Sequence, residues 1–140
     1  MNQVQWLLLP IIIHALFTAM LGVRMANARI AAAKARKVKM KDIALSPVTW
    51  PDDAKKLANN FDNQFDLPTT WYALACLVLV TTKLDVVFII LSWLFVAFRL
   101  WHSLEHTTGN RLPRRMYIYA GGLAVVVTMW LWFAWRLFVG

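Results

Sequence analysis

The sequence predicts an all-α membrane protein built as a four-transmembrane-helix bundle, and three observations lead to this fold class. Hydrophobic residues make up 60% of the chain and the mean hydropathy is +0.53, which is too apolar for an ordinary small soluble domain. Four stretches are apolar enough to cross a bilayer, which takes about 20 residues of helix. Their apolar runs are continuous rather than alternating, so self-satisfied helices are favoured over a barrel. We expect the 140 residues to form one domain, 1–140.

The first expected span covers residues 4–23 and continues into the helix-favouring stretch RMANARIAAAKARK, with Pro10 able to introduce an early kink. The second, residues 67–82, is short in its apolar part, and we expect the polar turns before it to lengthen it. Residues 84–100 and 116–139 form the third and fourth spans. Between the first two spans, Pro47 lies in a loop, and Pro51-Asp52-Asp53 has the proline and acids of a helix start.

The placement of positive charge predicts the topology. Of fifteen Lys and Arg residues, nine lie within residues 24–56 and four within residues 99–115. Each basic stretch joins an outgoing span to a returning one, so both lie on the same side of the membrane. The positive-inside rule then places both loops in the cytoplasm, with the N and C termini and the turn at 81–85 on the non-cytoplasmic side. Trp6, Trp132 and Trp135 fall where an outer aromatic belt is expected.

A net charge of +8 can indicate nucleic acid or an anionic membrane surface as a partner. Nothing in the chain resembles a nucleic-acid-binding module, so no nucleic acid is expected. Membrane lipids are the expected partners, above all for the segment KARKVKMK at residues 34–41.

One polar face leaves the third span in the segment RLWHSLEHTTGNRLPRR. In a helix, its members stand at i, i+3, i+7 and i+11, which places them on one side. Such a face at the mouth of a membrane helix is either a binding site or a fringe of side chains that reach the headgroups. The residues are Arg99, His102, His106 and Asn110.

A second polar face precedes the second span in the segment LANNFDNQFDLP. Carboxylates close to hydrocarbon are costly and need partners. Arg24 and Arg99 stand at the same ends of neighbouring spans, so a structural network that pairs Asp66 with Arg99 is one interpretation, and it is compatible with a binding site. The residues of this face are Asn59, Asp62, Asn63 and Asp66.

The ordered set of these motifs resembles the MAPEG family, the membrane-associated proteins in eicosanoid and glutathione metabolism. Asn-x-x-acid with a following Pro opens the second span, Arg-x-x-His leaves the third, and an Arg and a Tyr enter the fourth. The resemblance covers nearly the whole chain and is closest to bacterial members with an NQFELP-like motif. It implies a homotrimer of four-helix subunits that bind glutathione between them, and a bacterial inner membrane as the location.

The resemblance also implies site residues. The catalytic Arg of the family, which stabilises the glutathione thiolate, matches Arg115. The glutathione-binding positions match Arg24, Asn63, Asp66, Arg99, His102, His106 and Tyr119.

The chemistry of glutathione suits these residue types. Its two carboxylates favour bidentate pairing with Arg, and its thiol, with an ordinary pKa near about 8.5, must lose a proton to become a nucleophile. A hundredfold gain in thiolate corresponds to about 2.7 kcal/mol of differential stabilisation by a guanidinium. The implied activity is that of a glutathione transferase or peroxidase acting on lipophilic electrophiles that arrive from the membrane.

Several departures from the family pattern leave alternatives open. Asp66 replaces the usual Glu, His106 stands where many members have a Tyr, and Asn59/Asp62 offers a second Asn-x-x-acid register. One alternative is a non-catalytic lipid-binding or scaffold protein of the same fold. A multidrug exporter is disfavoured because the first span contains no carboxylate.

Two further readings concern histidines. His102 and His106 could hold a metal from one helix face, but no Cys or carboxylate completes the set, so no metal is expected. His14, within the first span, is expected to be a hydrogen-bonded residue between helices.

Overall fold

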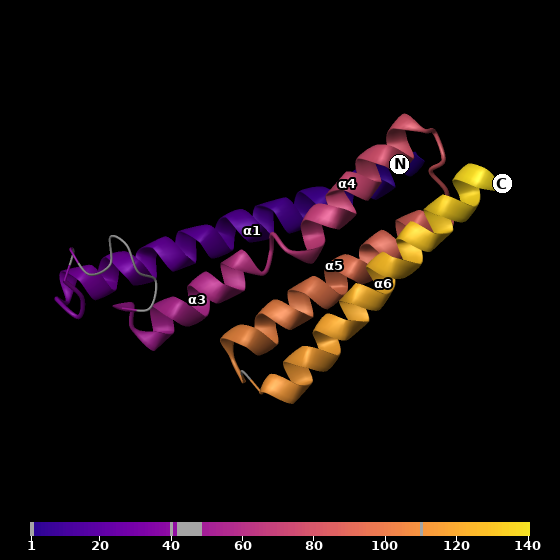
Figure 1. Ribbon diagram of the computed structural model, residues 1–140. Helices are drawn as coiled ribbons and strands as arrows, with labels where there is room; N and C mark the ends of the chain where they lie inside the picture. The colour runs from indigo at the N-terminus through magenta and orange to yellow at the C-terminus, as the bar shows by residue number, and fades with distance from the viewer. Residues whose placement is uncertain (1, 40, 42–48, 110) are drawn as a thin grey trace.

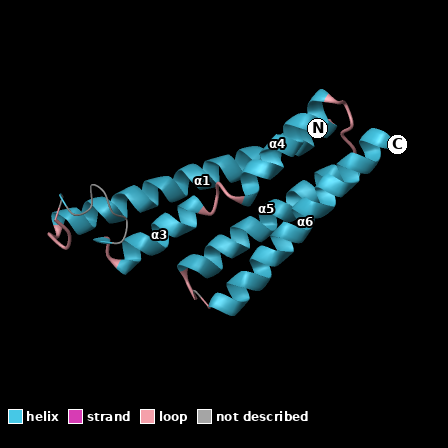
Figure 2. Ribbon diagram, viewed as in Figure 1, coloured by secondary structure: helices cyan, strands magenta, loops and turns pink. Residues whose placement is uncertain are grey.

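The computed structural model describes residues 2–39, 41, 49–109 and 111–140, and the regular elements in these ranges are helices (Figures 1 and 2). The predicted all-helical fold is therefore confirmed for the described chain. Pro47 and Asn110, which were assigned to a loop and to the polar face of the third span, lie outside the described residues. The helices are α1 (Gln3–Lys34), α3 (Asp52–Asp62), α4 (Leu67–Val80), α5 (Val86–Thr107) and α6 (Leu112–Phe138).

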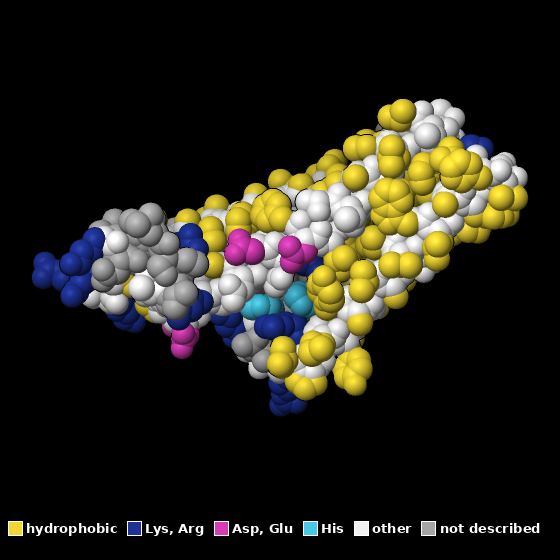
Figure 3. All heavy atoms as spheres, in the orientation of Figure 1, with side chains coloured by type: hydrophobic (Ala, Val, Ile, Leu, Met, Phe, Trp, Pro, Cys, Tyr) yellow, Lys and Arg dark blue, Asp and Glu magenta, His cyan; other side chains and the backbone are white. Residues whose placement is uncertain are grey.

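The helices run along one another in a single elongated bundle. Figure 1 shows α3 and α4 following each other along α1, with α5 and α6 side by side as a hairpin. Both termini and the turn between α4 and α5 lie at one end, here called the terminal end. The end of α1, the start of α3 and the turn between α5 and α6 lie toward the other, here called the basic end. It carries two groups of exposed basic residues, Lys34, Arg36 and Lys37 at the end of α1 and Arg111 and Arg114 at the start of α6 (Figure 3).

Three described helices, α1, α5 and α6, are long and apolar enough to cross a membrane. The 32-residue α1 is about 48 Å long, more than a hydrocarbon core of about 30 Å, so it extends beyond the core. Pro10 lies within this helix without ending it. The fourth helical region, α4, has 14 residues and is too short to span by itself. The polar turns before this region were expected to lengthen it, but they form a separate helix, α3, which ends at Asp62 before α4 begins at Leu67.

Local chemistry explains the helix ends. Asn2 and Gln5 form a capping box at the start of α1, with each side chain 2.9 Å from the other residue's backbone N–H. The Asp85 carboxylate accepts from the Phe88 N–H at 2.8 Å and starts α5. Pro68 has no N–H to donate, so α3 cannot continue into α4 without a broken hydrogen bond.

Buried polar residues are not spread evenly along the bundle. The apolar core occupies the terminal half, where Trp71, Leu74, Phe88, Phe95 and Met129 are buried together. Toward the basic end, buried apolar residues such as Leu21, Ala58 and Ile118 are joined by buried polar residues. The polar residues are His14, Asn60, Gln64, Arg99, His102, Ser103, Glu105 and His106, with Ser92 nearer the apolar core. Because buried polar groups are costly without partners, this concentration directs attention to the basic half.

Candidate functional site

The break between α3 and α4 supplies one wall of the site. Helix α3 ends at Asp62, and two tight turns follow, in which Gln64 N and Phe65 N donate to carbonyls three residues earlier. Carbonyls at a helix end lack intrahelical partners, so they are available to side chains. The Asn63 carbonyl accepts a hydrogen bond from Arg99 Nη2, which ties the break to α5.

Arg99 is the central charged group of this region. Its side chain is 1% exposed. Nη2 also lies 3.5 Å from Gln64 Oε1, whereas Nε and Nη1 are buried and donate to no group in the described chain. The ion pair of Arg99 with Asp66, which was one interpretation of the sequence, is not formed, because Asp66 is exposed at the start of α4. The guanidinium is thus held by neutral acceptors and keeps two N–H groups available.

The predicted polar face of α5 is buried as one row. Arg99, His102 and His106 are each less than 5% exposed, and the two imidazole rings have centroids 6.1 Å apart. Nδ1 of both histidines is buried without a hydrogen-bond partner in the described chain. A buried row with unused polar atoms fits a ligand site better than a fringe of side chains that reach the headgroups.

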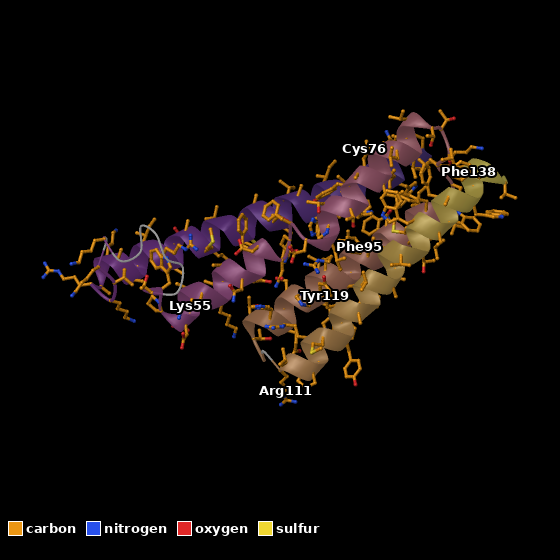
Figure 4. The ribbon with its side chains drawn as sticks, viewed as in Figure 1. Lys55, Cys76, Phe95, Arg111, Tyr119 and Phe138 are labelled. Atoms are coloured by element: carbon orange, nitrogen blue, oxygen red, sulfur yellow. The ribbon has the colours of Figure 1, made fainter. Side chains whose placement is uncertain are left out.

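Between α5 and α6, the structure has an open cleft of about 340 Å³. Figure 4 shows Tyr119 on α6, between Arg111 at one end of that helix and Phe138 at the other. The Tyr119 ring lies 5.9 Å from the ring of His102 across the cleft. The lining residues are Asn63, His102, Arg115, Met116, Tyr119, Ala120 and Leu123.

The cleft therefore brings together four of the predicted site residues: Asn63, His102, Arg115 and Tyr119. Arg99 lies next to it, one turn before His102 and hydrogen-bonded to Asn63. In the space-filling view, histidine and basic side chains meet in a hollow between the α3 and the α5–α6 parts of the surface (Figure 3). No carboxylate lines the cleft, so its charge suits an anionic ligand.

Besides Arg99, three predicted residues are not part of the cleft wall. His106 is buried one turn beyond His102. Arg24 and Asp66 are exposed, on α1 and at the start of α4 respectively.

The register of the polar face on α3 differs from the expected one. Asn59, Asp62 and Asp66 are exposed, whereas Asn60 and Gln64 are fully buried. Asn60 Nδ2 donates to Ser103 Oγ at 2.8 Å, and Gln64 Nε2 donates to the Asn60 carbonyl at 2.9 Å. The buried alanines Ala54 and Ala58 lie on another side of α3, because Ala58 and Asn60 are only two residues apart, so they do not identify the side that carries Asn60.

His14 is hydrogen-bonded between helices, as predicted. Its Nδ1 lies 2.6 Å from the Tyr72 hydroxyl, and its Nε2 lies 3.2 Å from Gln64 Oε1. Sequence analysis did not identify Tyr72 or Gln64 as part of this network, because an aromatic and an amide in a membrane segment have many ordinary roles.

A buried carboxylate stabilises the turn between α5 and α6. Glu105 is 7% exposed and forms an ion pair with Arg114, with Oε2 and Nε 3.3 Å apart. A Cβ on Gly109 would lie only 2.8 Å from Glu105 Oε1, so glycine lets the turn pass over this carboxylate. Within the described ranges, no group of three His, Cys, Asp or Glu residues could hold a metal ion.

The comparison with protein families agrees with this arrangement. The sequence model of the MAPEG family matches residues 7–135. Searches of curated proteins and of solved structures found no further match. The chain belongs to the MAPEG family, an integral membrane family whose members are glutathione-related transferases and peroxidases or proteins of lipid metabolism.

Proposed function

We propose that this MAPEG protein binds glutathione beside Arg99 and in the cleft between α5 and α6, and acts as a membrane-bound glutathione transferase or peroxidase. The observation that supports this most is the buried Arg99 guanidinium, whose Nε and Nη1 have no acceptor in the described chain. A buried charge without a partner is strongly unfavourable, and an anionic ligand would compensate it. A peptide carboxylate is the acceptor that a guanidinium binds best.

The cleft residues have the chemistry that the reaction needs. The Arg115 side chain would donate to the thiol sulfur and favour its deprotonated form, and the Tyr119 hydroxyl would add a second donor on the same helix face. Asn63 and His102 would orient the peptide through neutral hydrogen bonds. The apolar part of the lining, Met116, Ala120 and Leu123, would accept the lipophilic co-substrate.

The proposal includes a homotrimer, because two predicted residues face outward. Arg24 and Asp66 are exposed in the single chain and could complete the site of an adjacent copy. We also propose four spans with both termini outside and the basic end in the cytoplasm of a bacterial inner membrane. The two termini and the α4–α5 turn share one end of the bundle, which is compatible with this topology.

Membrane lipids are a second proposed partner. The basic end carries exposed Lys34, Arg36, Lys37, Lys39 and Lys41, which can pair with anionic headgroups at the surface. These residues lie on or after the part of α1 that extends beyond a hydrocarbon core. Their proposed role is attachment and orientation in the membrane, not catalysis.

Equilibrium binding of glutathione to the detergent-purified protein tests the proposal. Calorimetry should show saturable binding of glutathione, and the dipeptide Cys-Gly, which lacks the γ-glutamyl carboxylate, should bind at least tenfold more weakly. Native mass spectrometry of the same sample should report three chains. Absence of heat at millimolar glutathione would contradict the enzyme function.

A second candidate function is lipid binding without catalysis, and one feature favours it. Near the terminal end, α1 and α5 form an apolar groove of about 690 Å³, lined by Gln3, Trp6, Val86, Ile89, Ile90 and Trp93. Saturable binding of a fluorescent fatty acid, together with no binding of glutathione, would support this function over the first.

A further inference from the structure

A chain of side chains links three helical regions to Arg99. Gln64 Nε2 donates to the Asn60 carbonyl at 2.9 Å, which fixes the orientation of the Gln64 amide. Its oxygen therefore faces His14 and Arg99, with His14 Nε2 at 3.2 Å and Arg99 Nη2 at 3.5 Å. Since an amide oxygen can only accept, both of these nitrogens must donate to it.

This orientation also determines which tautomer a neutral His14 adopts. When Nε2 carries the hydrogen that is donated to Gln64, a neutral imidazole has a lone pair on Nδ1. Nδ1 lies 2.6 Å from the Tyr72 hydroxyl, so the hydroxyl donates to it. The hydrogen bonds thus run in one direction, from Tyr72 through His14 to Gln64. They end at Gln64 Oε1, which also accepts a hydrogen bond from Arg99 Nη2.

We propose that Tyr72, His14 and Gln64 are positioning residues that hold the Arg99 guanidinium toward glutathione without neutralising its charge. The inference rests on the proposed glutathione site. A carboxylate in the place of Gln64 would pair with Arg99 and compete with the carboxylate of the peptide. The neutral amide holds one nitrogen, Nη2, and leaves Nε and Nη1 for the ligand.

Burial makes the arrangement rigid. His14 and Gln64 are 0% and 1% exposed, and the imidazole also contacts the ring of Trp71 edge-on, with centroids 5.9 Å apart. Water therefore has little access to replace a lost hydrogen bond, and removal of one member should disturb the next. A preorganised guanidinium loses less side-chain freedom when the peptide binds.

Nuclear magnetic resonance of protein labelled with ¹⁵N-histidine tests the direction of the chain. The protein has three histidines, and the His14 signals are assigned by their loss in His14→Gln. We expect the neutral form with hydrogen on Nε2, and a shift of the Nδ1 signal in Tyr72→Phe. Hydrogen on Nδ1, or a charged imidazole at neutral pH, would overturn the proposal.

The affinity for glutathione tests whether Tyr72 and Gln64 position Arg99 for the ligand. Tyr72→Phe should weaken binding roughly 2- to 10-fold and Gln64→Leu more than that, while the double variant should bind no more weakly than Gln64→Leu alone. Ser92→Ala is the matched control, because it removes the buried hydrogen bonds of Ser92 with Trp71 Nε1 at 3.3 Å and with the Phe88 carbonyl at 2.9 Å, and none of those among Tyr72, His14 and Gln64. Additive losses, or an equal loss in Ser92→Ala, would show a general structural effect and overturn the positioning role.

The two experiments separate the inference from the function on which it rests. If the wild-type protein binds no glutathione, the proposed function fails, and with it the role toward that ligand. The histidine spectra would still decide whether the hydrogen-bonded chain exists.

Discussion

Arg114 Nε lies 3.3 Å from Glu105 Oε2, so the first turn of α6 is tied to the last turn of α5 by a pair with one buried and one half-exposed member. Arg115 follows Arg114 directly, and it lines the cleft while its neighbour faces Glu105. The two adjacent arginines thus have different environments: Arg114 pairs with Glu105 at the α5–α6 turn, and Arg115 lines the cleft.

The first prediction concerns this pair. Arg114→Ala leaves the buried Glu105 carboxylate without its cation, so the protein should lose about 1–3 kcal/mol of stability, seen as a lower unfolding temperature in detergent. Arg111→Ala, at an exposed position before α6, is the control and should leave the unfolding temperature unchanged. Equal effects of the two substitutions would contradict a specific role for the ion pair.

The second prediction concerns the packing of α5 on α6. A Cβ on Gly121 would lie 2.6 Å from Phe98 Cε1, whereas a Cβ on Gly122 would meet its nearest neighbour, Phe98 Cβ, at 3.6 Å. Gly121→Ala should therefore destabilise the hairpin by about 1–3 kcal/mol, and Gly122→Ala should be tolerated. Unfolding temperatures measure both. Recovery in the double variant Gly121→Ala/Phe98→Leu is expected, and its absence would mean that the clash lies elsewhere.

A third prediction concerns Asp85, whose carboxylate contacts three groups in the described part of the chain. Its carboxylate accepts from the Phe88 N–H at 2.8 Å and from Trp132 Nε1 at 2.9 Å, and it pairs with Arg136 at 3.2 Å. Asp85→Ala removes the helix cap and both contacts with α6, so the free energy of unfolding should fall by at least about 1 kcal/mol. Asp85→Asn keeps an oxygen for the cap and should fall between wild type and Asp85→Ala in unfolding temperature. The reverse order would argue against a capping role.

The fourth prediction separates two tyrosines of α6. Tyr119 lines the cleft, whereas Tyr117 is 80% exposed. Loss of one hydrogen bond to the ligand in Tyr119→Phe should weaken glutathione binding roughly 2- to 10-fold. Tyr117→Phe should bind as wild type does. Calorimetry compares the glutathione affinities of the two variants directly. Equal affinities would mean that the Tyr119 hydroxyl does not contact the ligand.

The positions of the long helices could be predicted from the apolar runs in the sequence. The buried polar face of α5 could be predicted from the spacing of its polar residues. Arg99, His102 and His106 repeat at helical intervals inside a long apolar segment, so their common orientation depends only on helix geometry. The structure buries all three. Starts of helices were also predictable where the chemistry is local, as at Pro51 before α3.

The face of α3 was not predictable in the same way. Asn59, Asn60, Asp62, Asn63 and Gln64 are all polar, so periodicity does not distinguish the inner residues from the outer ones. Which amides are buried depends on where the helix ends and on the partners that α1 and α5 present. Those partners, among them His14 and Ser103, come from distant parts of the chain.

The most direct measurement is an ultraviolet thiolate difference spectrum of the purified protein titrated with glutathione across a range of pH. A guanidinium at the sulfur favours the thiolate, so the pH midpoint of the band should lie below the ordinary thiol pKa of about 8.5. In Arg115→Ala the midpoint should return toward that value, and in Arg111→Ala it should stay as in wild type. A saturable band that depends on Arg115 is the result the account predicts. A midpoint at the ordinary value in the wild-type protein, or one that Arg115→Ala leaves unchanged, would contradict it.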